Sequence, residues 1–488
     1  MNTTHAPVLI VVFLFMGAFL LPVIARWKKE WVTPVVVGSL ALAALPLVSL
    51  WRDVQHTGTV RYFLGGWLPP WGIELYIDGL AGAMLGVMFC VGTLIFLYSL
   101  CSSPQELAAN VVPRYHALNL LLLGSMCGMI MTGDVFNLYV FMEISSLAAC
   151  GIIAVKGTRD SVEATFRYFV LSEMGSGCIL MGIAILYMLT GNLNMGFIAQ
   201  EMPNALAAAP LNVLASIGLM TIGFLVKAAL FPLHIWLPDA HSAAPTASSA
   251  MLSGLVVKVA PFALWRMLTR VYELEVISQI RVMQVLLLMA TAGVLIGSVL
   301  AMGQRQIKRM LAFSTVGQVA YIFLGLGLGS ETAITGAFLQ IANHAVIKAC
   351  LFMAAGALTI KTGITEVGQI AGLGRKMPFT MGALSLAALS MIGIPPLNGF
   401  MSKWYLAKGA MEAGRPFFVV VILGGSLLVL LYCFPLIVSA FFAKSETDDG
   451  SRVEVDEAPV AILIPLLAMA SLCIILGFFP QVLIQMLQ

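Results

Sequence analysis

Residues 227–238 read Lys-Ala-Ala-Leu-Phe-Pro-Leu-His-Ile-Trp-Leu-Pro, and they break one long apolar stretch of the sequence. A second apolar stretch is broken at residues 393–403 by Gly-Ile-Pro-Pro-Leu-Asn-Gly-Phe-Met-Ser-Lys. Proline inside a helix removes a backbone hydrogen bond and clashes with the preceding turn, so Pro232, Pro395 and Pro396 predict helix breaks. If the two stretches cross a membrane, such paired interruptions predict internal repeats with a site at their interface.

The composition places the whole chain in a membrane. Of its 488 residues, 60% are hydrophobic and only 10% are charged, whereas soluble chains carry about 25% charged residues. A spanning helix needs about 20 apolar residues, and the apolar runs predict about fourteen spans. We therefore expect an all-α polytopic membrane protein. No spacer is long enough for a separate soluble domain, and no basic run with interleaved aromatics favours nucleic-acid binding.

Basic residues predict which side of the membrane each linker faces. Most of them follow odd-numbered expected spans, as Arg26, Lys28 and Lys29 follow the first. By the positive-inside rule these linkers are cytoplasmic, which places both termini on the outer side of the cell (inner) membrane. Arg270 and Arg281, in an outer linker, are exceptions.

Two linkers and the cysteines carry further information. An outer loop has strand-like segments at 59–64 and 73–77, which predict a short hairpin. Residues 445–457 are acidic and polar, and they predict a solvated inner loop. The eight cysteines are scattered without CxxC or metal-ligand spacing. We expect them to be packing residues, and we expect no metal site.

Six ionisable residues stand inside apolar stretches. A charge near the bilayer centre costs about 2.5–3.5 kcal/mol on insertion scales. Membrane proteins keep such residues mainly where they face a wet interior and carry ions or protons. We therefore predict that six side chains transfer protons: Glu143, Lys227, Lys258, His344, Lys348 and Lys403.

Buried lysine and glutamate side chains can gain and lose protons near neutral pH. A buried lysine loses its proton readily because burial disfavours the charged form, and a nearby carboxylate acts in the opposite sense. A lysine between these two effects can exchange protons near neutral pH, whereas arginine stays protonated. The functional interpretation pairs Glu143 with a lysine on another span. The structural alternatives are a static salt bridge, or a glutamate satisfied by the hydroxyl of Ser145 or Ser146.

The remaining candidates also have two interpretations. His344 and Lys348 lie four residues apart, hence on one helical face, and histidine titrates near neutrality, so they predict a relay. Lys258 lies near the middle of its span, where snorkelling is the alternative. Lys403 is predicted to end the relay, but interfacial anchoring beside Trp404 is an alternative.

Three polar residues near the first break are secondary candidates for the proton path. His234 and His241 flank the break, and Asp239 lies between them. They could feed protons to Lys227 or Lys258, or only cap the helix that follows the break.

No motif for cofactor chemistry is present in the sequence. It has no P-loop, no GxGxxG after a strand, no haem CxxCH and no iron–sulfur spacing. We therefore expect no cofactor and no redox or hydrolytic site within this chain.

Three motifs resemble the antiporter-like subunits of respiratory complex I and of the Mrp cation/proton antiporters. They are Gly-Asp-Val-Phe-Asn-Leu-Tyr-Val-Phe-Met-Glu at 133–143 and the segments 227–241 and 393–403. The likeness covers nearly the whole chain. It implies two inverted five-helix repeats, each with an interrupted helix. The implied divisions are 1–114 with three helices and the outer hairpin, the repeats 115–270 and 271–442, and 443–488 with the acidic loop and last helix.

The resemblance also implies roles for the buried groups. Glu143 and Lys227 would form the coupling ion pair, and Lys258 would be the central relay. His344 and Lys348 would continue the relay, and Lys403 would be the terminal lysine.

The motifs point to two kinds of assembly. The run before Glu143 looks like the D-type component of Mrp antiporters, whereas residues 238–245 look closer to complex I and to membrane-bound hydrogenases. The first implies a proton-translocating subunit of a multi-subunit Na⁺/proton antiporter in the lipid bilayer, with other membrane subunits as partners. The second implies a proton-pumping subunit of a redox-driven complex. A solo transporter of an organic solute, and a passive scaffold or quinone-site subunit, are further alternatives.

Overall fold

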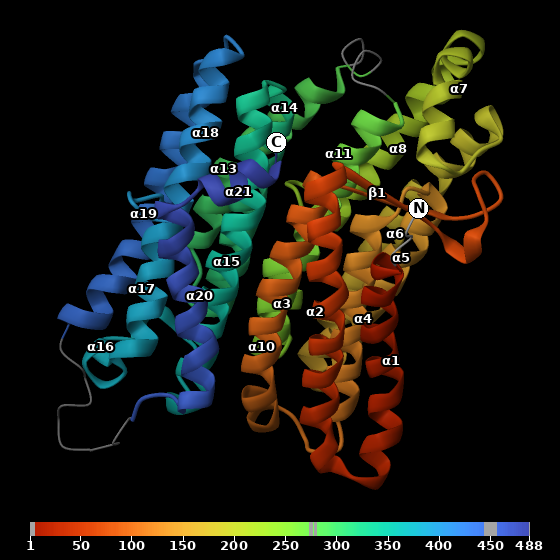
Figure 1. Ribbon diagram of the computed structural model, residues 1–488. Coiled ribbons are helices and arrows are strands. Elements are labelled where there is room, and N and C mark those ends of the chain that lie inside the picture. Colours follow the sequence, from red (N-terminus) through yellow and green to blue (C-terminus); the bar gives the residue numbers. More distant parts are fainter. Residues whose placement is uncertain (1–4, 273–276, 278–280, 444–455, 488) are drawn as a thin grey trace.

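The computed structural model describes residues 5–272, 277, 281–443 and 456–487. Long helices that run roughly parallel dominate it (Figure 1), which confirms the all-α membrane fold. The long helices are α1 (Ala6–Trp27), α2 (Val32–Thr57), α3 (Gly79–Glu106), α4 (Val112–Met131), α5 (Val135–Ala154), α6 (Arg159–Thr190), α8 (Pro210–Ala228), α11 (Val257–Arg270), α13 (Val282–Met302), α14 (Ile307–Leu328), α15 (Glu331–Thr362), α17 (Pro378–Ile392), α18 (Asn398–Glu412), α19 (Phe417–Phe442) and α20 (Val460–Phe478).

Several shorter elements connect these helices. They are α7 (Met195–Ala208), α9 (Trp236–Ala243), α10 (Thr246–Met251), the wide π-helical turn η3 (Leu252–Val256), α16 (Leu373–Lys376), α21 (Gln481–Leu487) and the 3₁₀ turns η1 (Lys29–Trp31), η2 (Leu64–Gly66) and η4 (Val367–Gln369). The helix α7 lies in the connection between α6 and α8. It begins where the side chain of Asn194 accepts hydrogen bonds from the backbone N–H groups of Gly196 and Phe197. Its 14 residues are too few to cross a bilayer.

Twelve helices in the described part of the chain are long and apolar enough to cross a membrane. The other expected spans are α4 and the broken pair α17–α18. The helix α4 has 20 residues but carries polar side chains, among them Arg114 and Asn119. The helices α17 and α18 have 15 residues each, because the second break divides their span.

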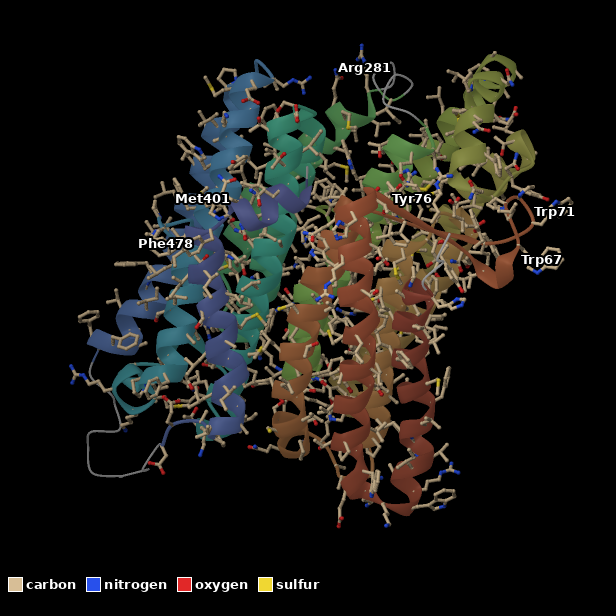
Figure 2. The ribbon with its side chains drawn as sticks, in the orientation of Figure 1. Trp67, Trp71, Tyr76, Arg281, Met401 and Phe478 are labelled. Carbon is tan, nitrogen blue, oxygen red and sulfur yellow. The ribbon has the colours of Figure 1, made fainter. Side chains whose placement is uncertain are left out.

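The predicted hairpin is present in the structure, and the side of the membrane on which it lies stays a prediction. The strands β1 (Thr59–Phe63) and β2 (Glu74–Asp78) pair antiparallel, with Val60 opposite Ile77. Trp67 and Trp71, in the connection between the strands, project away from the body of the molecule (Figure 2).

The chain ends lie toward the same end of the helical body, and the connection between α1 and α2 lies at the opposite end (Figure 1). This arrangement requires an even number of spans. Residues 445–455 of the predicted acidic loop lie outside the described residues.

Paired features recur in the two halves of the chain. The residue before α5, Asp134, forms an isolated β-bridge with Asn194 beyond α6. The residue before α14, Gln306, forms the same bridge with Glu366 beyond α15. Corresponding residues of the two bridges are separated by the same 172 positions in the sequence: 134 corresponds to 306, and 194 corresponds to 366. The helices α6 and α15 have 32 residues each. Because each expected repeat has five spans, an odd number, the second repeat would run in the opposite direction.

The two helix breaks are also built alike. The helix α8 ends before Ala229 and α17 ends before Gly393, and both residues are left-handed, with φ of 54° and 94°. A left-handed residue beyond the last turn is a common helix terminator, because its N–H group returns to a helical carbonyl. Phe231-Pro232 and Pro395-Pro396 follow these terminators, and both peptide bonds are cis. The predicted breaks are therefore present at both positions.

Candidate functional site

The first group of buried polar side chains surrounds Lys227 in the last turn of α8. Its Nζ atom donates hydrogen bonds to the hydroxyls of Ser146 on α5 and Ser172 on α6, both at 2.6 Å. The Nζ atom also lies 3.9 Å from Oε1 of Glu143 on α5. The C-terminal end of a helix carries partial negative charge, which favours an ammonium group there. Three helices therefore hold this lysine at the first break.

The Oε1 atom of Glu143 receives no hydrogen bond from Ser145 or Ser146, the two hydroxyls that the structural alternative names. Ser146 donates to the carbonyl of Met142 and accepts from Lys227. The Oε1 atom of Glu143 is buried and has no hydrogen-bond partner among the described residues. A buried carboxylate oxygen without a partner is costly. The long ion pair with Lys227 is thus the main contact that this oxygen makes.

Glu173, a second carboxyl at the same place, was not predicted from the sequence. It follows Ser172 on α6 and interacts electrostatically with both Glu143 and Lys227. Its position within the apolar stretch that forms α6 is the signal that could have identified it.

The second group includes Lys258 and Lys348, both fully buried. Lys258 follows the wide turn η3, and its Nζ atom donates to the carbonyl of Ser253 within that turn. Lys348 on α15 donates to the carbonyl of Leu311 at 2.8 Å and to the hydroxyl of Ser314, both on α14. Because the Lys258 side chain is fully buried, it does not snorkel to the surface. Single π-helical turns often lie at functional sites.

His344 lies one helical turn before Lys348 and is fully buried. It lies within electrostatic range of Lys258, Lys348 and Lys403. Within the described ranges, neither of its ring nitrogens has a hydrogen-bond partner. Buried polar groups are nearly always hydrogen-bonded to protein or to ordered water. The two ring nitrogens of His344 are therefore positions at which a buried polar group normally binds ordered water.

Lys403 is held by the second break. Its Nζ atom donates to the carbonyls of Met391 and Ile392, both at 2.9 Å, at the end of α17. The last carbonyls of a helix have no partner within the helix. Lys403 is 6% exposed, whereas the neighbouring Trp404 is 55% exposed. The tryptophan faces outward and the lysine faces inward, so interfacial anchoring does not describe Lys403.

The three secondary candidates lie in different surroundings. Asp239 pairs with Arg167 at 2.7 Å and with Arg309 at 3.2 Å. These three residues line a polar cavity of about 340 Å³. No side chain caps the N-terminus of α9 in the described structure, so the capping alternative for these residues is not observed.

The two histidines are separated from this ion-pair cluster. The ring of His234 packs against the rings of Phe231 and Phe313. His241 is fully buried, stacks on Phe352 and lies within electrostatic range of Lys258 and Lys348. His241 therefore joins the second group.

A second residue missed from the sequence is Arg266, which is buried on α11. It donates to the backbone carbonyls of Tyr76 at 2.7 Å and of Thr132 at 3.2 Å, and lies 3.8 Å from Asp78. These contacts attach the hairpin to α11 and to the end of α4, which is a structural role. A basic residue within the apolar stretch that contains Lys258 was the available signal.

The predicted groups thus form two clusters. Lys227 and Glu143 lie together with Glu173, whereas Lys258, His344, Lys348 and Lys403 form a second group that also includes His241.

Comparisons with known proteins agree with this architecture. The family model for the membrane domain of NADH:quinone oxidoreductase and Mrp antiporters matches residues 132–429. The N subunit of the NADH-quinone oxidoreductase of Desulforudis audaxviator is 39% identical, over 98% of this chain and 97% of that protein. The D subunit of the Na⁺/H⁺ antiporter of Alkalihalophilus pseudofirmus is 31% identical, over 99% of this chain and 95% of that protein.

Two solved structures also resemble this chain. A chain of an archaeal membrane-bound sulfane sulfur reductase, a respiratory membrane complex, has a TM-score of 0.90 and 33% identity, over 99% of this chain and 96% of that chain. A chain of the Mrp complex from Dietzia sp. has a TM-score of 0.88 and 25% identity, over 100% of this chain and 96% of that chain. The protein is therefore an antiporter-like membrane subunit and belongs to the NADH:quinone oxidoreductase/Mrp antiporter family.

Proposed function

We propose that this chain is a proton-translocating subunit of a multi-subunit Mrp-type antiporter that exchanges Na⁺ for protons. Protons are relayed along the membrane midplane by Lys258, His344, Lys348 and Lys403, and pairing of Glu143 with Lys227 gates the relay. The observation that carries the proposal is the burial of ionisable side chains on helices that face one another. A purely structural role would not need so many buried amines, since each costs free energy in the bilayer.

The contacts of these amines support a relay. Lys258 and Lys348 bind only carbonyl and hydroxyl oxygens in the described structure, and each lies within electrostatic range of His344. Nitrogen atoms of His241 and His344 without a described protein partner provide points at which water could join the chain.

A second candidate function is proton pumping in a redox-driven complex. It is favoured by the 39% identity with a component of an NADH-quinone oxidoreductase and by the likeness to a chain of an archaeal respiratory complex. Copurification separates the two candidates. Small membrane subunits alone would indicate cation exchange, and a soluble dehydrogenase or hydrogenase arm would indicate redox driving.

Replacement of the ion pair tests the proposal. We expect Lys227→Ala and Glu143→Ala to abolish ion-driven pH change in vesicles while the complex still assembles. Lys408→Ala is the matched control, because Lys408 is an exposed lysine on α18. Wild-type coupling in both ion-pair variants, with assembly intact, would refute the proposed function.

A further inference from the structure

The carboxyl of Glu173 adds a third ionisable group to the Lys227 site. We propose that Glu143 and Glu173 form a carboxyl pair that holds one proton between them and offers Lys227 two alternative partners. This inference rests on the proposed proton-translocating function and adds to the site a residue that controls its protonation.

The geometry of the two carboxyls supports a pair. Oε1 of Glu143 on α5 lies 3.9 Å from Nζ of Lys227 on α8. Glu173 on α6 directly follows Ser172, whose hydroxyl accepts a hydrogen bond from the same Nζ atom. One oxygen atom of each carboxyl, Oε1 in both cases, is buried and lacks a hydrogen-bond partner in the described part of the chain. The two carboxyls also interact with each other. A proton shared between them would give each of these buried oxygens a partner.

Charge balance leads to the same conclusion. Two ionised carboxylates beside one ammonium would leave a net negative charge within the membrane. Like charges that share a site cannot readily both ionise, so one such carboxyl keeps its proton. With one proton on the pair, the site of two carboxyls and one ammonium is neutral. Gain or loss of that proton changes the net charge of this three-residue site by one. Such a change in charge can control whether Lys227 pairs with a carboxylate.

The other titratable groups near Glu173 do not supply a competing cation. Tyr139 and Cys150 face it from α5, and both are neutral when protonated. The acidic residue of α9, Asp239, is engaged by Arg167 nearer the start of α6. The acidic residue of α7, Glu201, is exposed. Lys227 is therefore the cation that both carboxyls share.

The experiment compares Glu173→Gln with Glu143→Gln in the assembled complex reconstituted in vesicles. Glu201→Gln is the matched control, because it makes the same chemical change at an exposed site. One measurement is the pH dependence of cation-driven proton transport. The other is the infrared C=O stretch of protonated carboxyl groups, which does not depend on transport.

We expect Glu173→Gln to shift the pH profile of transport toward lower pH by about one unit, because a lone carboxyl releases its proton more readily than a pair. The carboxylic-acid band present at neutral pH should disappear in this variant and persist in Glu201→Gln. An unchanged profile and band in Glu173→Gln would overturn the carboxyl pair. If Glu173→Gln does not assemble, Glu173→Asp replaces it, and this variant should keep the carboxylic-acid band because it keeps a carboxyl at this position. Absence of the band from the wild-type complex would also overturn the inference.

The same experiment separates the inference from the proposed function. Loss of transport in Glu143→Gln together with an unaltered Glu173→Gln would leave the proposed function intact and refute the pair. Wild-type transport both in Glu143→Gln and in Lys227→Ala would refute the proposed function itself.

Discussion

Lys227 and Lys403 lie beside the two helix breaks and bind different partners there. Lys227 binds two hydroxyls and lies near an acid, whereas Lys403 binds the free carbonyls at the end of α17. The burial of both lysines within the helical body could be predicted, because the sequence places each of them inside an apolar run. Their partners were not, since Ser146 and Ser172 lie 81 and 55 positions away from Lys227 along the chain. Such partners are fixed by helix packing.

Lys227→Arg tests whether the amine must release a proton. Arginine keeps a positive charge but stays protonated at accessible pH. We expect transport to fall at least tenfold in vesicles, with the complex still assembled. Lys408→Arg, on the exposed surface of α18, should behave as wild type. Wild-type transport by Lys227→Arg would show that the position needs only a charge.

The interrupted helices were the elements best predicted from the sequence, because proline has a direct effect on helical backbone. The wide turn η3 was not predicted, and it aims Lys258 at the carbonyl of Ser253. Its width depends on packing against other helices, which leaves no local signature. The amphipathic helix α7 was missed for a similar reason, since it is too short to give a membrane-span signal.

The second break depends on glycine at position 393. Gly393 has φ of 94°, and an added Cβ atom would lie 3.0 Å from Cδ of Lys403. A side chain in left-handed backbone costs about 1–2 kcal/mol. We expect Gly393→Ala to lower the thermal stability of the purified complex. Gly382→Ala, on the same helix with open space around it, should raise or preserve it. Equal stability of the two variants would contradict this role of Gly393.

The paired features of the molecule support the proposed division into two five-helix repeats, with α1–α3 before them and α20 after them. The matching bridges, the equal lengths of α6 and α15 and the paired breaks are visible once the fold is known. From the sequence, the paired helix breaks and the family resemblance both predicted the repeats, whereas the matching bridges join residues that lie far apart along the chain.

The proposed orientation has a direct test. Lys29 lies in the connection between α1 and α2, and Glu201 lies on α7. We expect Glu201→Cys to react with a membrane-impermeant maleimide in intact cells, and Lys29→Cys to react only after the membrane is opened. Both variants are made with Cys90 replaced by alanine, because that cysteine is exposed. The opposite labelling pattern would place both termini in the cytoplasm.

The proposed relay depends most on water that links buried groups across the midplane. A structure of the assembled complex in lipid, at a resolution that shows ordered water, tests this most directly. We predict water molecules bound to the rings of His241 and His344 and continuing to Lys258 and Lys348. Apolar side chains packed directly against those ring nitrogens, with no water between the lysines, would contradict the relay.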